Sequence, residues 1–513
     1  MHAGPMQHLA AAIGRSLDRI AGESLNPWHH LGALAFYLFW IVTVSGIYVY
    51  AAFDTSASGA YASVERLTRE QWYAGGVMRS LHRYASDAFV AVLGLHLLRE
   101  LLQGHWRGFR WFSWLTGVPL IWFAYASGIG GYWLVWDQVA QFSIVATAEW
   151  LDWLPLGGDA IIRNFLYPID DRFFSLLIFL HIGIPLLLLA TMWLHIQRIS
   201  HARTMPPRAL GLGVLALLLA TSIVSPARSH APADPALLET PLGLDWFYLF
   251  VHPVQYWTSP GTLWMLAAGV TLALSLLPVV SRSPRPQVAR VDPQFCNGCA
   301  RCADDCPYAA IVMEPRVGAR TGQRLPRVDP DACAACGICA GACPSSTPFR
   351  STEALVTGID MPQATIQQKR LALERALGGR EDAHPVVVFG CERAARLSAL
   401  DAEAVAIPLI CVAMLPPSFV EYALRSGAGA VLVNACPSSE CEYRLGAAWM
   451  EQRLAARREP HLRASVDPAR LAFVRAGAGE EAALRRAFAE LRARTATLTA
   501  ASTPARLRKR RYG

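Results

Sequence analysis

Four histidines form two equally spaced pairs inside apolar segments of the sequence. His82 and His96 lie in one segment and His181 and His195 in another, with thirteen residues between the members of each pair. Fourteen steps of about 100° make nearly four helical turns, so both members share one helix face, roughly 21 Å apart along the axis. A neutral imidazole nitrogen is a good iron ligand. Two such helices side by side would supply two sites with two histidine ligands each.

A histidine in a membrane helix can also do no more than bond a neighbouring helix. Ionisable residues inside a membrane are costly, however, and two pairs with identical spacing favour the ligand interpretation. The chain direction pairs His82 with His181 near the outer face, and His96 with His195 near the cytoplasmic face.

Glycines repeat the same spacing in two further segments. Gly32 and Gly46 lie in the first apolar segment, and Gly117 and Gly131 lie in or beside the third. A glycine lets a flat macrocycle approach the backbone, although small residues in membrane helices also serve simple helix packing. Together with the histidines, the glycines predict two planes in which porphyrins lie between four helices.

The twelve cysteines all lie after residue 295. Eight of them form two copies of the pattern C-x2-C-x2-C-x3-C-P, at residues 296–307 and 333–344. In this spacing three thiolates of one loop hold an iron–sulfur cubane and the fourth reaches a second cluster. A pair of zinc sites is the alternative, but the duplicated spacing with both trailing prolines argues against it.

Four cysteines remain after these repeats, namely Cys391, Cys411, Cys436 and Cys441. The first three follow short β-branched runs, so we expect their loops to converge at one sheet edge, with Cys441 opening the next helix. Four thiolates suit a [2Fe–2S] cluster or structural zinc.

Six apolar segments are long enough to cross a bilayer, which takes about 20 residues of helix. They run near residues 31–53, 77–102, 114–136, 173–197, 208–225 and 260–280. Arginines gather before the first segment and after the second, fourth and sixth. The positive-inside rule therefore predicts that both termini lie in the cytoplasm. Residues 6–21 are expected to form either an amphipathic surface helix or an ordinary frayed terminus.

The composition excludes a single soluble domain. Of the 513 residues 53% are hydrophobic and 17% are charged, with a net charge of +8. The positive charge lies in loops beside apolar segments and in the tail, which indicates membrane topology rather than a nucleic-acid surface. No G-x-G-x-x-G or Walker A sequence marks a nucleotide site.

Residues 15–280 resemble the cytochrome b of cytochrome bc complexes. The resemblance rests on the histidine and glycine pairs, on residues 79–82 (RSLH), 131–138 (GYWLVWDQ) and 233–235 (ADP), and on residues 240–248 (TPLGLDWFY), which are similar to the family's Pro-Glu-Trp-Tyr motif. It implies two b hemes on the four histidines, Arg79 and Arg99 as partners of the heme propionates, and a quinone as substrate.

Three positions depart from that family. Asp245 stands where the family usually has Glu, and Leu244 and Val135 stand where it usually has Pro. With fewer spans than a full-length cytochrome b, these departures argue against bifurcated quinol oxidation and leave a simpler quinone site. Asp245 would carry a quinone proton there, or would be only a loop carboxylate at the interface.

Residues 288–350 resemble bacterial ferredoxins with two [4Fe–4S] clusters. That pattern implies that one cluster is held by Cys296, Cys299, Cys302 and Cys343, and the other by Cys333, Cys336, Cys339 and Cys306. Residues 384–456 resemble the delta subunit of methyl-viologen-reducing hydrogenases, through Cys391, Cys411, residues 427–433 and residues 436–443 (CPSSECEY). The second resemblance implies one [2Fe–2S] cluster, favoured over zinc, and docking to a flavoprotein.

The expected fold is therefore multidomain. A transmembrane all-α helix bundle (1–283) is followed by an α+β ferredoxin-like domain (288–350), a small α/β domain (384–495) and a disordered basic tail (496–513). The strands expected in the α/β domain are residues 385–389, 405–410, 430–434 and 471–474.

The resemblances imply membrane-bound electron transfer between cytoplasmic clusters and the quinone pool of a respiratory chain. A soluble flavoprotein, or a heterodisulfide-reductase-like or dehydrogenase subunit, would exchange electrons with the clusters, in the bacterial inner membrane. The cytochrome b family also suggests pairing of two copies, and no nucleic-acid partner is expected. The alternatives are reverse flow from quinol to low-potential clusters driven by the membrane potential, a non-catalytic heme-bearing anchor for a soluble iron–sulfur enzyme, and a redox sensor.

Overall fold

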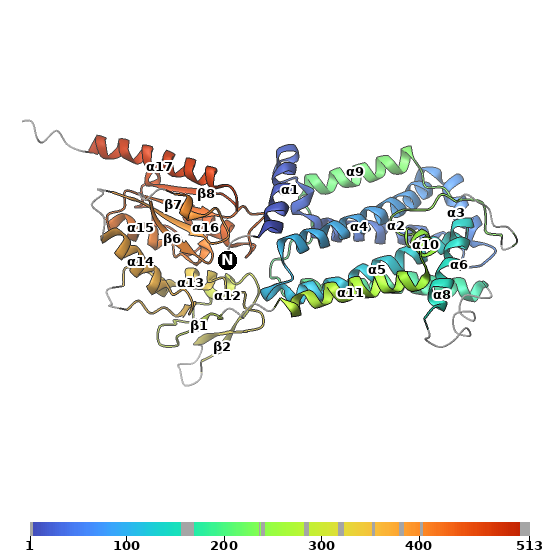
Figure 1. Cartoon of the computed structure of the whole chain (residues 1–513), viewed down its shortest axis with the longest axis horizontal. Coiled ribbons are helices and arrows are strands. Elements are labelled where there is room, and N and C mark those ends of the chain that lie inside the picture. Colours follow the sequence, from blue (N-terminus) through green and yellow to red (C-terminus); the bar gives the residue numbers. More distant parts are fainter. Residues whose placement is uncertain are drawn as a thin grey trace, which may run out of the picture. The chain divides into compact units, whose positions relative to one another are not determined.

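The computed structural model describes residues 4–154, 169–234, 236, 242–281, 287–316, 323–350, 354–378, 384–400 and 404–502, with backbone only for 497–502. These residues form two compact units (Figure 1). The helical unit comprises Ile13–Gln197 and Ala202–Ser283, and the cysteine unit comprises Met1–Ala12, Arg198–His201 and Pro284–Gly513.

Long helices make up most of the described part of the helical unit. In chain order they are α2 (Leu31–Ala51), α3 (Ala60–Arg69), α4 (Val77–Gln103), α5 (Trp111–Val135), α6 (Gln138–Asp152), α8 (Asp171–Ile196), α9 (Arg208–Val224), α10 (Val251–Trp257) and α11 (Pro260–Val280). Helix α1 (Pro5–Ala21) precedes them, and short turns of helix lie at Pro27–His29, Trp72–Gly76 and Gly108–Arg110.

Side-chain caps set where several of these helices begin. The Asp170 carboxylate accepts from the amide of Phe173 at the start of α8, and Asp137 accepts from Ala140 at the start of α6. Each cap satisfies one of the amides that a helix leaves without a partner at its first turn. Helix α4 ends at Gly104, whose φ of 72° suits glycine.

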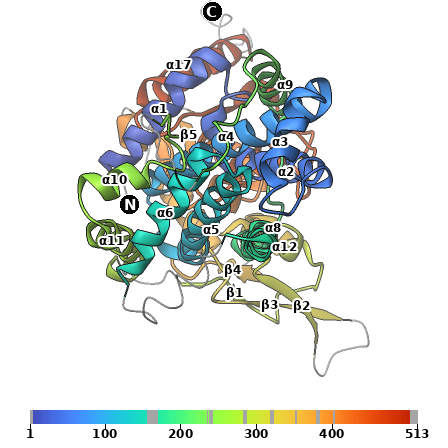
Figure 2. The ribbon, with the colours of Figure 1, turned by 90° about the vertical axis from the view of Figure 1, so that its right-hand side faces the viewer.

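The histidine-bearing helices each pack against a glycine-bearing helix. Helix α4 lies along α2, and α8 lies along α5, with an apolar core that includes Leu38, Phe89, Leu120 and Leu188. Figure 2 shows this unit from the side on which α3 and α6 lie. The pairing places both predicted ligand helices within one bundle.

Four helices are long and apolar enough to cross a membrane: Leu31–Ala51, Gly108–Val135, Asp171–Ile196 and Pro260–Val280. The prediction of a multi-pass membrane protein is therefore confirmed. The predicted spans 77–102 and 208–225 form α4 and α9, but α4 carries several charged residues and α9 has 17 residues, so neither meets the same criterion. Their crossing stays a prediction, for which the 27 residues of α4 give a helix about 40 Å long.

Strands appear in the cysteine unit. Strand β1 (Arg290–Val291) pairs with β4 (Ile359–Asp360), and β2 (Ile311–Pro315) pairs with β3 (Arg324–Val328), both antiparallel. A parallel sheet has the order β6-β5-β7-β8, built from β5 (Val386–Cys391), β6 (Ala404–Leu409), β7 (Ala430–Ala435) and β8 (Leu471–Arg475). The helices are α12 (Arg301–Asp304), α13 (Ile338–Ala342), α14 (Ile366–Gly378), α15 (Ser418–Arg425), α16 (Gly446–Leu454) and α17 (Glu481–Ser502), with single turns at Pro344–Ser346 (η4), Leu397–Ala399 (η5), Val412–Met414 (η6) and Pro468–Arg470 (η7).

The parallel sheet confirms the predicted α/β fold of the C-terminal part. Every residue of β5 and β7 is buried, as expected for central strands covered on both faces. Helix α17 covers one face through Leu484, Phe488 and Leu491. The four strands begin and end within two residues of the predicted positions.

One sequence expectation is wrong: Cys441 does not open a helix, because α16 begins at Gly446. Helix α17 continues to Ser502, and the basic tail expected over residues 496–513 stays a prediction. Residues 503–513 lie outside the described part, as do residues 155–168, residues 282–286, and Pro235, Thr240 and Pro241 of the family motifs.

Candidate redox centres

The rings of His82 and His181 face each other with their centres 6.3 Å apart. Two imidazoles that bind one metal ion through bonds of about 2.0–2.1 Å place their centres roughly 6 Å apart. The Nδ1 atom of His82 donates to the carbonyl of Val42 at 2.9 Å, and that of His181 donates to the carbonyl of Ser127 at 2.9 Å. These bonds fix the tautomer that leaves both Nε2 atoms free to bind a metal.

The inner pair has different surroundings. His195 lies within electrostatic range of His96, and its Nδ1 is 3.3 Å from Thr116 Oγ1. The Nδ1 of His96 has no hydrogen-bond partner among the described residues, and its nearest charged neighbour is the Glu100 carboxylate, with Oε1 at 3.9 Å. The two pairs therefore differ in what lies behind the ligand rings.

Each predicted glycine lies against one of these four histidines. A Cβ atom would approach the histidine Cε1 to 2.8 Å at Gly46 (His82), 2.9 Å at Gly131 (His181), 3.1 Å at Gly117 (His195) and 3.3 Å at Gly32 (His96). The sequence predicted that the glycines admit a macrocycle to the backbone. In the structure they also make the space in which the imidazole rings themselves sit.

This donor set fits heme. Two neutral imidazoles in an apolar bundle would hold a heme iron between them, and the distance between the facing rings of the outer pair suits one metal ion. The structure thus brings together His82 with His181 as the sequence predicted, and places His96 near His195.

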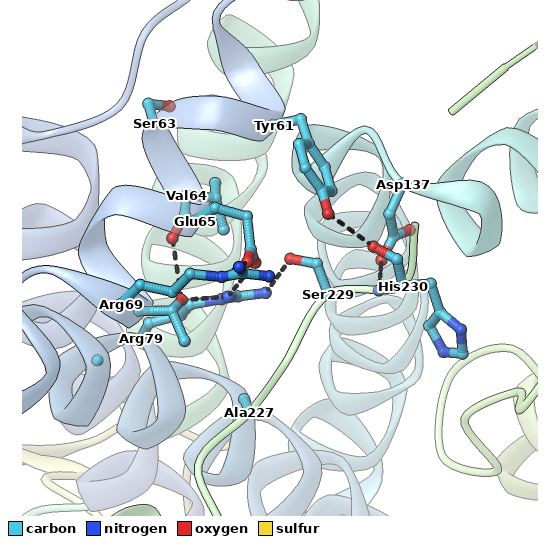
Figure 3. A network of polar contacts seen from close by, with 12 residues as sticks. Tyr61, Ser63, Val64, Glu65, Arg69, Arg79, Asp137, Ala227, Ser229 and His230 are labelled. Carbon is cyan, nitrogen blue, oxygen red and sulfur yellow. Dashed lines mark hydrogen bonds and ion pairs between the residues drawn. The ribbon is translucent and has the colours of Figure 1, made fainter. Parts of the chain in front are cut away.

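Arg79, which the resemblance assigned to a propionate, takes part in a polar network (Figure 3). Its guanidinium donates to Glu65 Oε1 at 3.4 Å, to the Thr68 hydroxyl, and to Ser229 Oγ at 2.7 Å. Only 10% of its side chain is exposed. In this structure Arg79 therefore joins α3 and the 225–230 segment to α4, and its propionate role stays a prediction. Arg99 donates to Glu100 Oε1 at 3.0 Å.

Asp245 lies in a buried charged cluster. Its Oδ1 accepts from Arg83 Nη2 at 2.9 Å, and its Oδ2 accepts from the amide of Tyr248 at 2.6 Å. Arg83 also pairs with Asp87 and lies 4.7 Å from the centre of the Tyr132 ring. With its side chain 7% exposed, Asp245 is not a free carboxylate at a surface.

A second charged cluster, around Glu100, was missed from the sequence. Its Oε2 lies 2.5 Å from His105 Nδ1 and 4.0 Å from Arg110 Nη1, and its Oε1 accepts from Arg99. Glu100 could have been found in the sequence from its position four residues after His96, because that spacing puts both side chains on one helix face.

Glu100→Gln is expected to raise the midpoint potential of the inner heme by roughly 40–60 mV, equivalent to about 1–1.4 kcal/mol for one electron. A carboxylate beside the His96 ring stabilises the more positive, oxidised centre, and the amide removes that charge. Redox titration of the heme absorbance measures the shift, with the outer heme as internal control. Equal shifts of both hemes, or none, would contradict this role of Glu100.

The eight cysteines of the repeats fall into two groups. Cys296, Cys299, Cys302 and Cys343 line one hollow, here called the first cluster site. Cys306, Cys333, Cys336 and Cys339 are mutual electrostatic neighbours and form the second cluster site. Each group takes one cysteine from the other repeat, as the ferredoxin resemblance implied.

The two cysteine loops share a backbone conformation as well as a sequence pattern. Gly298 and Ala300 in the first loop, and Ala335 and Gly337 in the second, all have positive φ between 54° and 76°. Such turns direct successive amides inward, where they can hydrogen-bond sulfur, as the amide of Ala310 does to Cys306 Sγ at 3.2 Å. The loops and their thiols fit the predicted [4Fe–4S] clusters.

The remaining cysteines meet at one end of the parallel sheet. Cys391 ends β5, and Cys411 and Cys436 lie within two residues of the ends of β6 and β7, so the predicted convergence is confirmed. Cys391 Sγ and Cys436 Sγ are 3.9 Å apart, and all four thiols are buried. A Cβ atom on Gly446 would come within 2.2 Å of Cys411 Sγ. The four thiols form the C-terminal centre.

One thiol of this centre is prepared for deprotonation. The pKa of Cys441 is lowered to about 7, because the Cys436 thiol donates to it and the amides of Ala447, Tyr443 and Gly446 point at it. A thiolate is the metal-binding form of cysteine. Among the described residues, no three His, Cys, Asp or Glu side chains lie in positions that would hold a single metal ion without rearrangement. The donor set itself suits either a [2Fe–2S] cluster or zinc.

Fold and site together define a multi-pass membrane protein with a histidine-paired helix bundle and three cysteine centres. Comparison with known families names its parts. Residues 16–203 match the model for cytochrome b/b6/petB, residues 295–347 the 4Fe-4S dicluster domain, and residues 386–499 the methyl-viologen-reducing hydrogenase delta subunit. All three predicted resemblances are confirmed.

Individual relatives match the helical part. Cytochrome b of Rhodospirillum rubrum is 24% identical over 262 residues, covering 45% of this chain and 64% of the relative. Cytochrome b of Allochromatium vinosum is 29% identical, covering 36% of this chain and 45% of the relative. The chain thus spans less than two thirds of the length of these two proteins. A solved structure titled "Hyperthermophilic respiratory Complex III" aligns with a TM-score of 0.43 and 20% identity, over 53% of this chain and 82% of that chain.

Proposed function

We propose that this chain carries electrons between iron–sulfur clusters in the cytoplasm and the membrane quinone pool through two b hemes. The observation that carries the proposal is the facing pair His82 and His181, with ring centres 6.3 Å apart and both Nδ1 atoms bonded to backbone carbonyls. Heme, when bound, supplies a carrier of one electron at a time. The chain would be the electron-transfer subunit of a quinone-linked oxidoreductase.

The positions of the side chains support one assignment of the groups. His82 and His181 would hold the outer heme, and His96 and His195 would hold the inner heme. The first and second cluster sites would hold one [4Fe–4S] cluster each. The C-terminal centre holds a [2Fe–2S] cluster, which its match to the hydrogenase delta subunit favours over zinc.

The cluster around Asp245 supports a quinone site. Asp245 and Asp87 flank the Arg83 guanidinium, and the Tyr132 phenol lies beside it. A carboxylate that can pass from Arg83 to a quinone oxygen can accept or deliver the proton that accompanies quinone chemistry. We assign that role to Asp245.

Direction and location complete the proposal. Electrons would pass from a soluble flavoprotein or heterodisulfide-reductase-like partner, through the cysteine centres, to the hemes and quinone. The arginine distribution favours a cytoplasmic location for both termini and for the clusters, in a bacterial inner membrane. Electron movement between hemes would be biased by the membrane potential, by about 2.3 kcal/mol per 100 mV for a full crossing.

Asp245→Asn is expected to lower the rate of quinone reduction at least tenfold in proteoliposomes that contain the full chain, reduced methyl viologen and a short-chain quinone. Both hemes should still become reduced, because only the proton carrier is lost. His181→Ala should abolish quinone reduction with the clusters still reduced.

A redox titration of hemes by absorbance and clusters by EPR tests the direction. Heme potentials above the cluster potentials support flow toward quinone. Cluster reduction by quinol only in energised membranes would instead establish the reverse direction. Undiminished quinone-linked turnover in His181→Ala would overturn the proposal in favour of a membrane anchor.

A further inference from the structure

We infer that the second cluster site is a branch point, and that the first cluster site is a side branch rather than a link between the C-terminal centre and the hemes. The branch presupposes the proposed function, because it orders the same carriers. It differs from a linear path that passes through every cysteine centre in turn. The contacts that set the order all lie within the cysteine unit.

The second cluster site packs directly on the C-terminal centre. Cys336 belongs to the same buried core cluster as Cys391, Cys411, Cys436 and Cys441. Cys411 also has Cys336 among its electrostatic neighbours. No cysteine of the first site is among the described members of that core cluster.

Backbone packing explains this closeness. Helix α13, which carries Cys339, lies against η6, which directly follows Cys411. A Cβ atom on Gly341 would come within 2.1 Å of the carbonyl oxygen of Ala413, and one on Gly337 within 3.0 Å of Met414 Cβ. Glycine at these two positions lets the second cluster loop touch the loop that holds Cys411.

The second cluster site also contacts the segment that follows α8 in the chain. The Ser200 amide donates to the carbonyl of Pro307 at 3.1 Å, and its hydroxyl donates to the carbonyl of Cys306 at 2.9 Å. The loop of the C-terminal centre contacts the same segment: Arg444, three positions after Cys441, donates to the carbonyls of Ser200 and His201 at 3.1 Å each.

This segment has a special place in the sequence. Residues 198–201 belong to the cysteine unit, and Arg198 follows His195 by three positions. Bonded contacts therefore run from Cys306, a ligand of the second cluster, into the chain that continues to a predicted heme ligand. Arg198 likewise donates to the carbonyl of Asp331, two positions before Cys333, at 3.3 Å.

The first cluster site is bounded by its own segment and by solvent. All described residues that line its hollow lie between Cys296 and Ile359, including Asn297, Met313 and Pro326. Cys299 is exposed. The core cluster that contains Cys302 also contains Cys339, so the first site adjoins the second.

An electron from the C-terminal centre can therefore reach residues 198–201 through the second site without passing through the first site. Each step oxidises one carrier by one electron and reduces its neighbour by one, with no bond formed and no proton moved. Within the chain, the first site exchanges electrons with the second site, which it adjoins. Cys299 of the first site is exposed.

EPR power saturation of the [2Fe–2S] signal tests this order in the full-length, cluster-loaded and fully reduced protein. A neighbouring reduced [4Fe–4S] cluster relaxes quickly and raises the half-saturation power of the [2Fe–2S] signal. Cys333→Ala, which removes a ligand of the second cluster, should lower that power at least tenfold. Cys299→Ala, the matched change at the first cluster, should alter it less than twofold.

Rapid mixing with dithionite gives a second measurement, in which heme reduction should slow more than tenfold in Cys333→Ala and less than threefold in Cys299→Ala. Cys306→Ser replaces Cys333→Ala if that variant does not fold. The opposite pattern between the two cluster sites would overturn the branch. Absence of heme reduction in the unmodified protein, with the expected saturation pattern, would count against the proposed function and leave the branch standing.

Discussion

Gly131→Ala is expected to remove most of the outer heme and to leave the inner heme in place. The added methyl group would lie 2.9 Å from His181 Cε1, closer than side-chain carbons approach other atoms. Because α5 and α8 pack along each other, the backbone cannot easily yield, and the imidazole must turn. A turned ring no longer faces His82 at the distance that one iron requires. The heme content per chain should fall from about two toward one.

The neighbouring glycine provides a matched control. A Cβ atom at Gly130 would meet only Leu177 Cδ1, at 3.7 Å, which is an ordinary van der Waals contact. Both variants add one methyl group to the same helix and gain the same helix propensity, about 1 kcal/mol. Gly130→Ala should therefore keep both hemes in a pyridine hemochrome assay. Equal heme loss in the two variants would show that Gly131 has no special relation to His181.

The sequence could predict which histidines lie on one helix face because helix geometry converts spacing into position. Thirteen intervening residues place His82 and His96 on one face whatever surrounds them, and the same holds for His181 and His195. The cysteine repeats are equally local, since each loop supplies three thiols from seven residues. The four strands were predictable from their β-branched composition, because both faces of a central parallel strand are buried.

Contacts between distant residues could not be predicted in the same way. Asp245 stood in a family motif, but only the fold brings Arg83 to it across 162 positions. The cluster around Glu100 depends on the turn at Gly104, which returns His105 toward the end of α4. Cys441 was expected to open a helix, whereas α16 begins at Gly446.

The glycines illustrate a partial success. Their spacing marked the planes of the predicted hemes, and the structure places each beside the expected histidine. Their contact with the imidazole ring was not predicted, because the sequence gives the helix face but not the rotamer of the facing side chain. The order of the cysteine centres was likewise hidden, since it depends on the close approach of Gly341 to Ala413.

Asp305→Asn is expected to destabilise the cysteine unit by roughly 3–5 kcal/mol, the usual result of leaving a buried charge without its partner. Arg453 on α16 is fully buried, and its guanidinium pairs with the Asp305 carboxylate and donates to the carbonyl of Ala413 at 2.8 Å. Burial lowers the pKa of Arg453, and Asp305 opposes that shift by favouring the charged form. Asp305 directly precedes Cys306, so its loss should also loosen the second cluster site.

Guanidinium chloride titration of the cluster absorbance in the full-length protein measures this effect. The double variant Asp305→Asn/Arg453→Met should regain much of the lost stability, because the fully buried charge is then removed, and Arg458, which also pairs with Asp305, keeps 26% of its side chain exposed to water. Glu314→Gln is the matched surface control. Because the pair of Glu314 with Arg327 is exposed, the denaturation midpoint of this variant should not change measurably. If Asp305→Asn were as silent as Glu314→Gln, the buried pair would not hold the second cluster site against the C-terminal centre. The short route between those centres would then depend on the glycine contacts of α13 alone.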